Sequence, residues 1–255
     1  MISVGHWRAA WSLIVLALLP LATPALAQYP NRPITIMVGF SAGGTSDVAA
    51  RILAERMSRT LSTPVVIENR TGAGGSVAAA AASRAAPDGY TIFLSDPGAY
   101  AINPLIFPQN ARYDSLVDFT PIALVGESPL VLVVPSGRPF RTLEALTAAI
   151  KARPEQSNYA SSGVAGITQF GAEVYLKRAG DLAALHVPYR GGAPMVEAIL
   201  KGEVDFGVAV LASAVSQIEG GGVRALALAA PSATRAVANV PLLQDMGFPG
   251  TRLSS

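Results

Sequence analysis

Residues 34–57 read ITIMVGFSAGGTSDVAARILAERM, and three patterns follow one another within them. Ile34–Val38 is a short apolar run rich in β-branched residues, which predicts a buried strand. The glycine-rich residues 39–47 break this run. The apolar residues beyond them recur at helical spacing, at Val48, Ile52, Leu53, Met57 and Leu61. The predicted order is therefore strand, glycine loop and helix.

The start of the predicted helix is suited to an anion. Thr45, Ser46 or Asp47 can cap the helix by accepting hydrogen bonds from its free backbone N–H groups. The loop also directs the remaining N–H groups and the positive end of the helix dipole at whatever lies over it. Three interpretations stay open: a tight turn without a ligand, a cradle for an anion, and the site of a nucleophile.

The same strand, loop and helix order recurs along the chain, and it predicts an α/β fold. Alternation of this kind is typical of mostly parallel sheets with helices on both faces. In such sheets, ligands bind beyond the carboxyl ends of the strands. Further strands are expected at residues 64–69, 91–94, 158–161, 184–187, 204–209 and 224–229. Further helices are expected at residues 77–86, 142–151, 168–178, 195–201 and 212–219.

The first 27 residues have the pattern of a secretory signal peptide. Arg8 supplies a positive charge, residues 11–21 are largely apolar, and residues 25–27 match an A-x-A cleavage site. We therefore expect cleavage before Gln28 and export to the periplasm. A retained membrane anchor is the alternative, but the apolar run is short for a membrane span.

The remaining 228 residues are enough for two modest lobes or one large α/β domain. They carry 18 basic and 17 acidic residues, without a basic run interleaved with aromatic residues, so we predict no nucleic-acid binding. Because the chain has no cysteine, it forms no disulfide and offers no lipoprotein anchor. His186 is the one histidine of this part, so we predict no metal site.

Residues 39–43 also match the G-x-S-x-G motif of serine hydrolases, with Ser41 as the nucleophile. His186 follows later in the chain, as the hydrolase order requires. Two observations disfavour this alternative: few residues precede the motif to form the usual sheet, and His186 lies in an apolar strand. Because the loop matches neither common phosphate-binding motif, we expect no nucleotide and no other cofactor.

Several loops together offer neutral hydrogen-bond donors for a small carboxylate. These are the backbone N–H groups of residues 41–45 and the hydroxyl groups of Ser95, Ser161, Ser162 and Thr168. Such a set can hold a carboxylate without a buried arginine. For any one loop, a tight turn without a ligand stays the alternative.

Ten short segments, taken in chain order, carry the likeness to a known family. They are residues 29–34 (YPNRPI), 40–47 (FSAGGTSD), 66–70 (VIENR), 72–75 (GAGG), 86–91 (APDGYT), 102–104 (INP), 118–121 (DFTP), 158–161 (NYAS), 186–189 (HVPY) and 224–227 (RALA). In these segments the chain resembles the Bug family, the extracytoplasmic solute receptors of tripartite tricarboxylate transporters.

The resemblance implies a two-lobed periplasmic binding protein that closes over a di- or tricarboxylate or an acidic amino acid. It implies a monomer that serves the integral-membrane permease subunits of the transporter and catalyses no reaction. The expected parts are a signal peptide (1–27), lobe one (28–127), lobe two (128–230) and the start of a crossing back to lobe one (231–255).

The resemblance also implies a ligand site. Asp205 would contribute from a strand end, and Asp47 is as readily a helix cap as a ligand contact. Ser95 and Asp96 would flank the ligand carboxylate. The remaining expected contacts are Phe40, Ser41, Ala42, Gly43, Gly44 and Thr45 from the first-strand loop, and Ser161, Ser162 and Gly163 from lobe two.

The chain departs from the family pattern at three places. Ala165, Gly166 and Gln169 stand where relatives often have a glycine, a small hydroxyl residue and a histidine. Residues 209–210 replace an aspartate–asparagine pair. Family chains also usually continue beyond Ser255, so we interpret this chain as truncated. A non-functional truncated remnant is therefore a further alternative beside the hydrolase.

Overall fold

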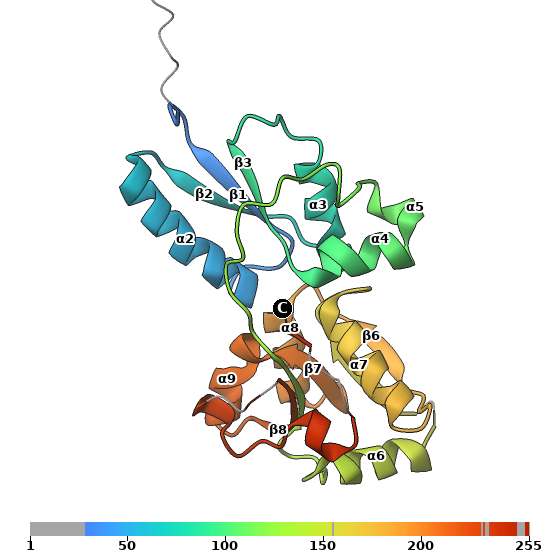
Figure 1. The fold of residues 1–255 in the computed structure, drawn as a ribbon. Helices are drawn as coiled ribbons and strands as arrows, with labels where there is room; N and C mark the ends of the chain where they lie inside the picture. Colours follow the sequence, from blue (N-terminus) through green and yellow to red (C-terminus); the bar gives the residue numbers. More distant parts are fainter. Residues whose placement is uncertain (1–28, 155, 231, 233–234, 249–252, 255) are drawn as a thin grey trace, which may run out of the picture. The chain divides into compact units, whose positions relative to one another are not determined.

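The computed structural model describes residues 29–154, 156–230, 232, 235–248 and 253–254. The predicted signal peptide, residues 1–27, lies outside them. Arg32–Ser255 forms one compact unit that contains two sheets (Figure 1). Within the described residues, we find no helix with both the length and the apolar character of a membrane span.

The first sheet has three parallel strands in the order β2-β1-β3. They are β1 (Ile34–Val38), β2 (Val65–Asn69) and β3 (Thr91–Leu94), close to the predicted ranges. We call this sheet and its helices the first lobe, residues 34–111. The helices are α2 (Thr45–Leu61), η1 (Ala73–Gly75), α3 (Ser76–Ala82), η2 (Gly98–Ile102), α4 (Asn103–Ile106) and α5 (Pro108–Ala111).

The buried face of α2 differs from the predicted one. Ala50 and Ala54 pack on β1, whereas Val48 and Ile52 are 49% and 54% exposed. At 3.6 residues per turn, the two exposed residues lie on the side of the helix opposite the two alanines. Leu53 and Met57 pack against the core as expected. Helical spacing alone thus identified the helix but assigned two residues to the wrong face.

The second sheet has five strands in the order β6-β5-β7-β4-β8. The pairs β5–β6 and β5–β7 are parallel, whereas β4 is antiparallel to both β7 and β8. The second sheet is therefore mixed. The antiparallel direction of β4 was not predicted, because an apolar run predicts a buried strand but carries no signal for its direction. The strands are β4 (Leu130–Pro135), β5 (Asn158–Ser161), β6 (Leu185–Pro188), β7 (Phe206–Val210) and β8 (Val223–Ala229).

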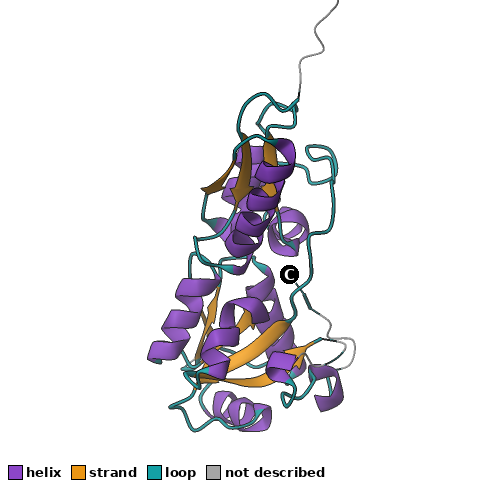
Figure 2. Cartoon of the chain, turned by 90° about the vertical axis from the view of Figure 1, so that its left-hand side faces the viewer, coloured by secondary structure: helices purple, strands orange, loops and turns teal. Residues whose placement is uncertain are grey.

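Helices cover both faces of this sheet (Figure 2). Leu130, Leu132 and Val134 of β4 belong to a core with α6 and α7, and Val131 and Val133 belong to a second core with α8 and α9. This alternation is expected for a strand buried on both faces. We call the sheet and its helices the second lobe, residues 130–229. The helices are α6 (Leu143–Ala152), α7 (Ile167–Arg178), α8 (Gly192–Lys201) and α9 (Leu211–Glu219).

The connection between the lobes, residues 112–129, is mostly irregular. Its apolar residues Ile122 and Leu124 are 78% and 79% exposed. After β8, two short helical turns follow, η3 (Arg235–Val237) and η4 (Leu243–Met246). Near the end of the described chain, Ser254 forms an antiparallel bridge with Pro129. The predicted lobe boundaries at residues 127 and 230 stay predictions.

Candidate ligand-binding site

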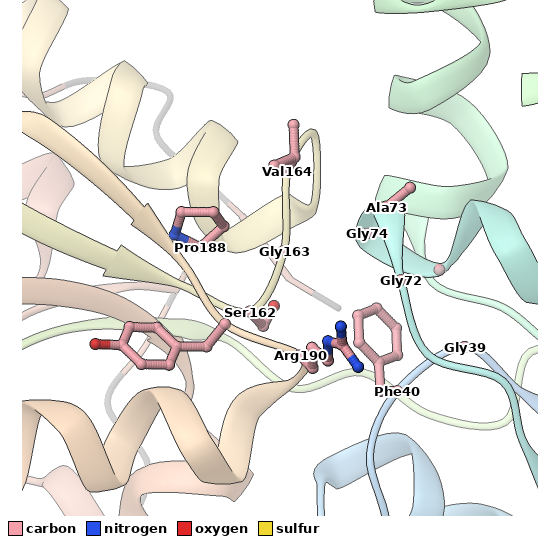
Figure 3. Close-up of a pocket in the computed structure, with 12 residues that line it drawn as sticks. Gly39, Phe40, Gly72, Ala73, Gly74, Ser162, Gly163, Val164, Pro188 and Arg190 are labelled. Atoms are coloured by element: carbon pink, nitrogen blue, oxygen red, sulfur yellow. The ribbon is translucent and has the colours of Figure 1, made fainter. Parts of the chain in front are cut away.

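A cavity of about 310 Å³ lies at the carboxyl ends of four strands, two from each lobe (Figure 3). The lining residues follow β1, β2, β5 and β6, where bound ligands are expected in sheets of this kind. Five of the 12 lining residues are glycines, so backbone groups form much of the surface. The lining residues are Gly39, Phe40, Gly72, Ala73, Gly74, Gly75, Ser162, Gly163, Val164, Pro188, Tyr189 and Arg190.

Glycine is required where the loops of the two lobes meet. A Cβ atom on Gly74 would lie 2.5 Å from the carbonyl oxygen of Val164 in the second lobe. Gly74 also has a φ of +57°, which disfavours other residues. Within the first lobe, a Cβ atom on Gly39 would lie 2.6 Å from Cα of Gly75. The cavity therefore depends on backbones that approach each other without side chains.

Two buried hydroxyl groups lie near the start of α2: that of Ser41 in the β1–α2 loop, residues 39–44, and that of Thr45, the first residue of the helix. Ser41 Oγ and Thr45 Oγ1 are buried and have no hydrogen-bond partner within the described part of the chain. Buried polar groups normally have a partner. The two hydroxyl groups therefore have unused hydrogen-bonding capacity, but neither Ser41 nor Thr45 lines the cavity, and neither do residues 42–44. The ring of Phe40 lines the cavity, while Ala42 and Gly43 are exposed.

The Asp47 carboxylate is bonded to neighbouring groups of the protein rather than left open to a ligand. Its carboxylate accepts hydrogen bonds from the backbone N–H of Gly43 at 2.9 Å and from Asn69 Nδ2 at 3.0 Å. It also pairs with Arg51 at 2.8 and 3.0 Å. The Arg51 guanidinium lowers the pKa of Asp47 to about 2, helped by the Gly43 and Asn69 bonds. Asp47 thus secures the loop and the first turn of α2.

Ser95 and Asp96 do not line the cavity. The Ser95 hydroxyl donates to the carbonyl oxygen of Asp96 at 3.2 Å. Asp96 is 8% exposed, and its Oδ1 accepts the backbone N–H of Ala99 at 2.9 Å, which secures the start of η2. Burial raises the pKa of Asp96 to about 6, against the stabilising effect of its backbone hydrogen bonds.

Of the three residues expected at the end of β5, Ser162 and Gly163 line the cavity, whereas Ser161 is buried and does not line it. Ser161 is fully buried, and its Oγ lies 2.6 Å from Nε2 of His186. Burial lowers the pKa of His186, whose ring stacks on Tyr159. Ser161 and His186 therefore support the loop that follows β5.

Two side chains at the start of α7 hold the preceding loop, and one of them, Gln169, is at a position that departs from the family pattern. Gln169 Oε1 accepts the backbone N–H of Ala165 at 2.7 Å. Thr168 Oγ1 accepts the backbone N–H of Ser162 at 2.9 Å. Gly166 is the N-cap residue of α7. These bonds fix the loop whose residues 162–164 line the cavity.

Asp205 is not brought to the cavity. It directly precedes β7, and its Oδ2 accepts the backbone N–H of Asn158, the first residue of β5, at 3.1 Å. Its Oδ1 lies 3.2 Å from the Arg138 guanidinium. Because the cavity lies beyond the last residue of β5, Asp205 is at the opposite end of the strand. Asp205 is thus at a strand end, as expected, but at the end away from the cavity.

Two lining segments were absent from the predicted site, residues 72–75 and residues 188–190. Both follow predicted strands, so the rule that ligands bind at carboxyl ends could have found them. Arg190 belongs to the second of these segments.

The hydrolase alternative requires a base beside Ser41. The single histidine of the described chain, His186, directs Nε2 to Ser161 instead. Ser41 Oγ has no hydrogen-bond partner in the same part of the chain. The G-x-S-x-G match is therefore not accompanied by a serine–histidine pair.

Comparison with known proteins gives the family. A model described as the tripartite tricarboxylate transporter family receptor matches residues 49–255. The chain belongs to this receptor family. The family consists of solute receptors rather than enzymes, and no match supports the hydrolase alternative.

Individual relatives agree with this family. Protein BugT of Bordetella pertussis is 35% identical over 238 residues, which cover 92% of this chain and 72% of BugT. The structure of MatC from Rhodopseudomonas palustris with bound malate has a TM-score of 0.84 at 30% identity, covering 89% of this chain and 76% of MatC. R. palustris Rpa4515 with adipate has the same TM-score and identity, covering 89% and 75%. The predicted Bug resemblance and two-lobed fold are thus confirmed.

Proposed function

We propose that this receptor captures a small carboxylate: a di- or tricarboxylate or an acidic amino acid. The observation that carries the proposal is the cavity lined by glycine loops at the carboxyl ends of four strands. Ligands of receptors and enzymes with such sheets occupy this position. A volume of about 310 Å³ is at the small end of ligand pockets, which favours a metabolite-sized ligand.

The donors around the cavity favour an anion. The β1–α2 loop precedes the 17-residue helix α2, whose N-terminus carries a partial positive charge. Ser41 and Thr45 add two buried hydroxyl groups without a partner in the described residues. We assign the carboxylate to this loop, with residues 40–45 as contacts and Ser162 and Gly163 opposite them. Malate and adipate in two solved relatives are consistent with this chemistry.

Capture would follow from closure of the lobes around the ligand. A ligand that touches both lobes binds the closed form better and shifts the population toward it. We further propose that the signal peptide directs the chain to the periplasm, where the monomeric, liganded receptor docks on the permease subunits. No catalytic step is part of this function.

Thermal unfolding with a panel of carboxylates tests the proposal. At a concentration 100-fold above its Kd, a ligand that binds only the folded state stabilises it by about 2.7 kcal/mol. We expect malate, adipate, citrate or glutamate to raise the melting temperature by several degrees. If none does so in a chain that unfolds cooperatively, carboxylate capture is wrong. A chain without a cooperative transition is the outcome that the remnant alternative predicts.

A variant of the loop locates the binding. Ser41→Ala removes one neutral hydrogen bond, so carboxylate affinity should fall about 2- to 10-fold. Ser216→Ala, at an exposed position of α9, is the matched control and should bind as the unchanged chain does. Equal affinities for all three proteins would place the carboxylate elsewhere. Esterase turnover lost in Ser41→Ala would instead support the hydrolase.

A further inference from the structure

Arg190 differs from every other residue that lines the cavity. It is the one lining residue with a full charge, because the others are glycines, apolar residues, a serine and a tyrosine. The walls of the cavity are therefore neutral except where Arg190 enters from the second lobe.

The charge of Arg190 is not neutralised within the described part of the chain. No carboxylate there pairs with it, and its side chain forms no hydrogen bond there. By contrast, five other arginines of the same residues have acidic partners, namely Arg32, Arg51, Arg59, Arg70 and Arg138. An unpaired guanidinium keeps five N–H donors for a ligand. Its fork geometry matches a carboxylate with two parallel hydrogen bonds.

Arg190 also lies close to the proposed carboxylate cradle. The next residue, Gly191, has a φ of +126°, and a Cβ atom on it would lie 2.5 Å from Ser41 Oγ and 3.1 Å from Ser41 N. The backbone at this turn therefore abuts the β1–α2 loop. Arg190 and Phe40 of this loop both line the cavity, and in the close-up the Arg190 side chain points toward the side of Phe40 (Figure 3).

The cavity thus has neutral walls, which include Gly39 and Phe40 of the β1–α2 loop, and one cationic fork, which comes from the second lobe. The neutral walls can hold one carboxylate. We propose that Arg190 is a specificity-determining residue that binds a second carboxylate and so selects short dicarboxylates over monocarboxylates. This inference rests on the proposed function, because it requires the ligand to occupy this cavity.

Isothermal titration calorimetry with matched ligand pairs tests it. Adipate and hexanoate have the same number of carbon atoms, as do succinate and butyrate, and each pair differs in one carboxylate. We expect the unchanged chain to bind the dicarboxylate of a pair more tightly. Arg190→Gln should weaken dicarboxylate binding by about tenfold and monocarboxylate binding by less than about twofold. The tenfold loss is at the low end for a hydrogen bond to a charged group, because the Arg190 side chain is exposed.

Two further variants and the salt dependence separate charge recognition from a structural effect. Arg190→Lys keeps the charge and should retain part of the preference. Arg56→Gln removes an exposed arginine of α2 that does not line the cavity, and it should bind as the unchanged chain does. Because salt screens exposed charges, dicarboxylate affinity should fall with salt in the unchanged chain and fall less in Arg190→Gln.

Each result decides between the two proposals. If Arg190→Gln binds dicarboxylates as the unchanged chain does, or loses both members of a pair equally, the role of Arg190 is wrong and carboxylate capture stands. If the unchanged chain binds none of the four compounds, nor any other carboxylate, the proposed function fails and the role of Arg190 fails with it.

Discussion

The two lobes bury their strands to different degrees. All six residues of β4 in the second lobe are buried, whereas all four residues of β3 in the first lobe are only partly buried. The second lobe has two large apolar cores, one on each face of its sheet. In the first lobe, the core between α2 and the sheet has four buried residues: Ile36, Val38, Ala50 and Ala54.

Side-chain size explains this difference. The helices of the first lobe bury alanines, Ala50 and Ala54 from α2 and Ala79 from α3, which allow close approach but remove little apolar surface from water. The helices of the second lobe bury larger residues, such as Tyr175 and Ile199. The second lobe therefore supplies more of the folding free energy, while the first lobe supplies the glycine loops that form half of the cavity.

The largest effect should follow from a truncation in the second-lobe core. Leu132→Ala removes a side chain that is 1% exposed and should lower the free energy of unfolding by about 2–5 kcal/mol. Ile92→Ala, at a partly buried position of β3, should cost about 1–2 kcal/mol because less surface is lost. Denaturant unfolding of both variants measures the two costs. Equal costs would contradict the difference between the lobes.

The contact between the lobes should be broken by Gly74→Ala. The new Cβ would collide with the Val164 carbonyl oxygen, so the lobes could not approach, and ligand affinity should fall on the order of 100-fold, roughly 2.7 kcal/mol. Gly202→Ala is the matched control, since Gly202 also has a positive φ, +72°, but nothing lies within 4 Å of its Cβ position.

Both substitutions place alanine in a left-handed conformation, so both should lower the free energy of unfolding by about 1–2 kcal/mol. Calorimetry measures the ligand affinity and thermal unfolding measures the stability of each variant, so together they separate backbone strain from the loss of contact between the lobes. If Gly202→Ala loses as much ligand affinity as Gly74→Ala, backbone strain rather than the collision is responsible.

The smallest effect concerns pH, where two buried carboxylates of the first lobe act in opposite directions. The pKa of Asp96 is about 6 in the folded protein against 3.8 ordinarily, so folding takes up a proton as the pH falls through 6. Stability should therefore increase as the pH falls from about 6 to 3.8. The pKa of Asp47 is about 2, so its contribution is present above pH 3.8 and is lost below it.

Asp96→Asn isolates the first effect. The amide keeps an oxygen for the Ala99 N–H but carries no charge, so the variant should be more stable at pH 7.5 by about 1–2 kcal/mol, with about half of this gain left at pH 5 and none below pH 3.8. His186 titrates in the same range with the opposite sign, and the difference between the two proteins removes its contribution. Thermal unfolding across this range provides the test, and a constant difference from pH 8 to pH 5 would contradict it.

Most strands and helices could be predicted from local patterns. Ile34–Val38, Asn158–Ser161 and the helix that follows each of them lie within one or two residues of the expected positions. The buried face of α2 and the direction of β4 were not predicted correctly from these patterns. Val48 and Ile52 fit helical spacing but face away from the sheet, and the direction of β4 was not encoded in its apolar run.

The sequence by itself determined the family, the alternation of strands, glycine loops and helices, and the position of a glycine loop before the first helix. These depend on local backbone preferences and on periodicity, which a single segment carries. Only the tertiary structure decided which loops share the cavity. It placed residues 72–75 and Arg190 at its wall, Ser161 in the buried interior and Asp205 at the far end of β5. Such placement depends on strand order and on backbone contacts between segments far apart in the chain, which no local pattern records.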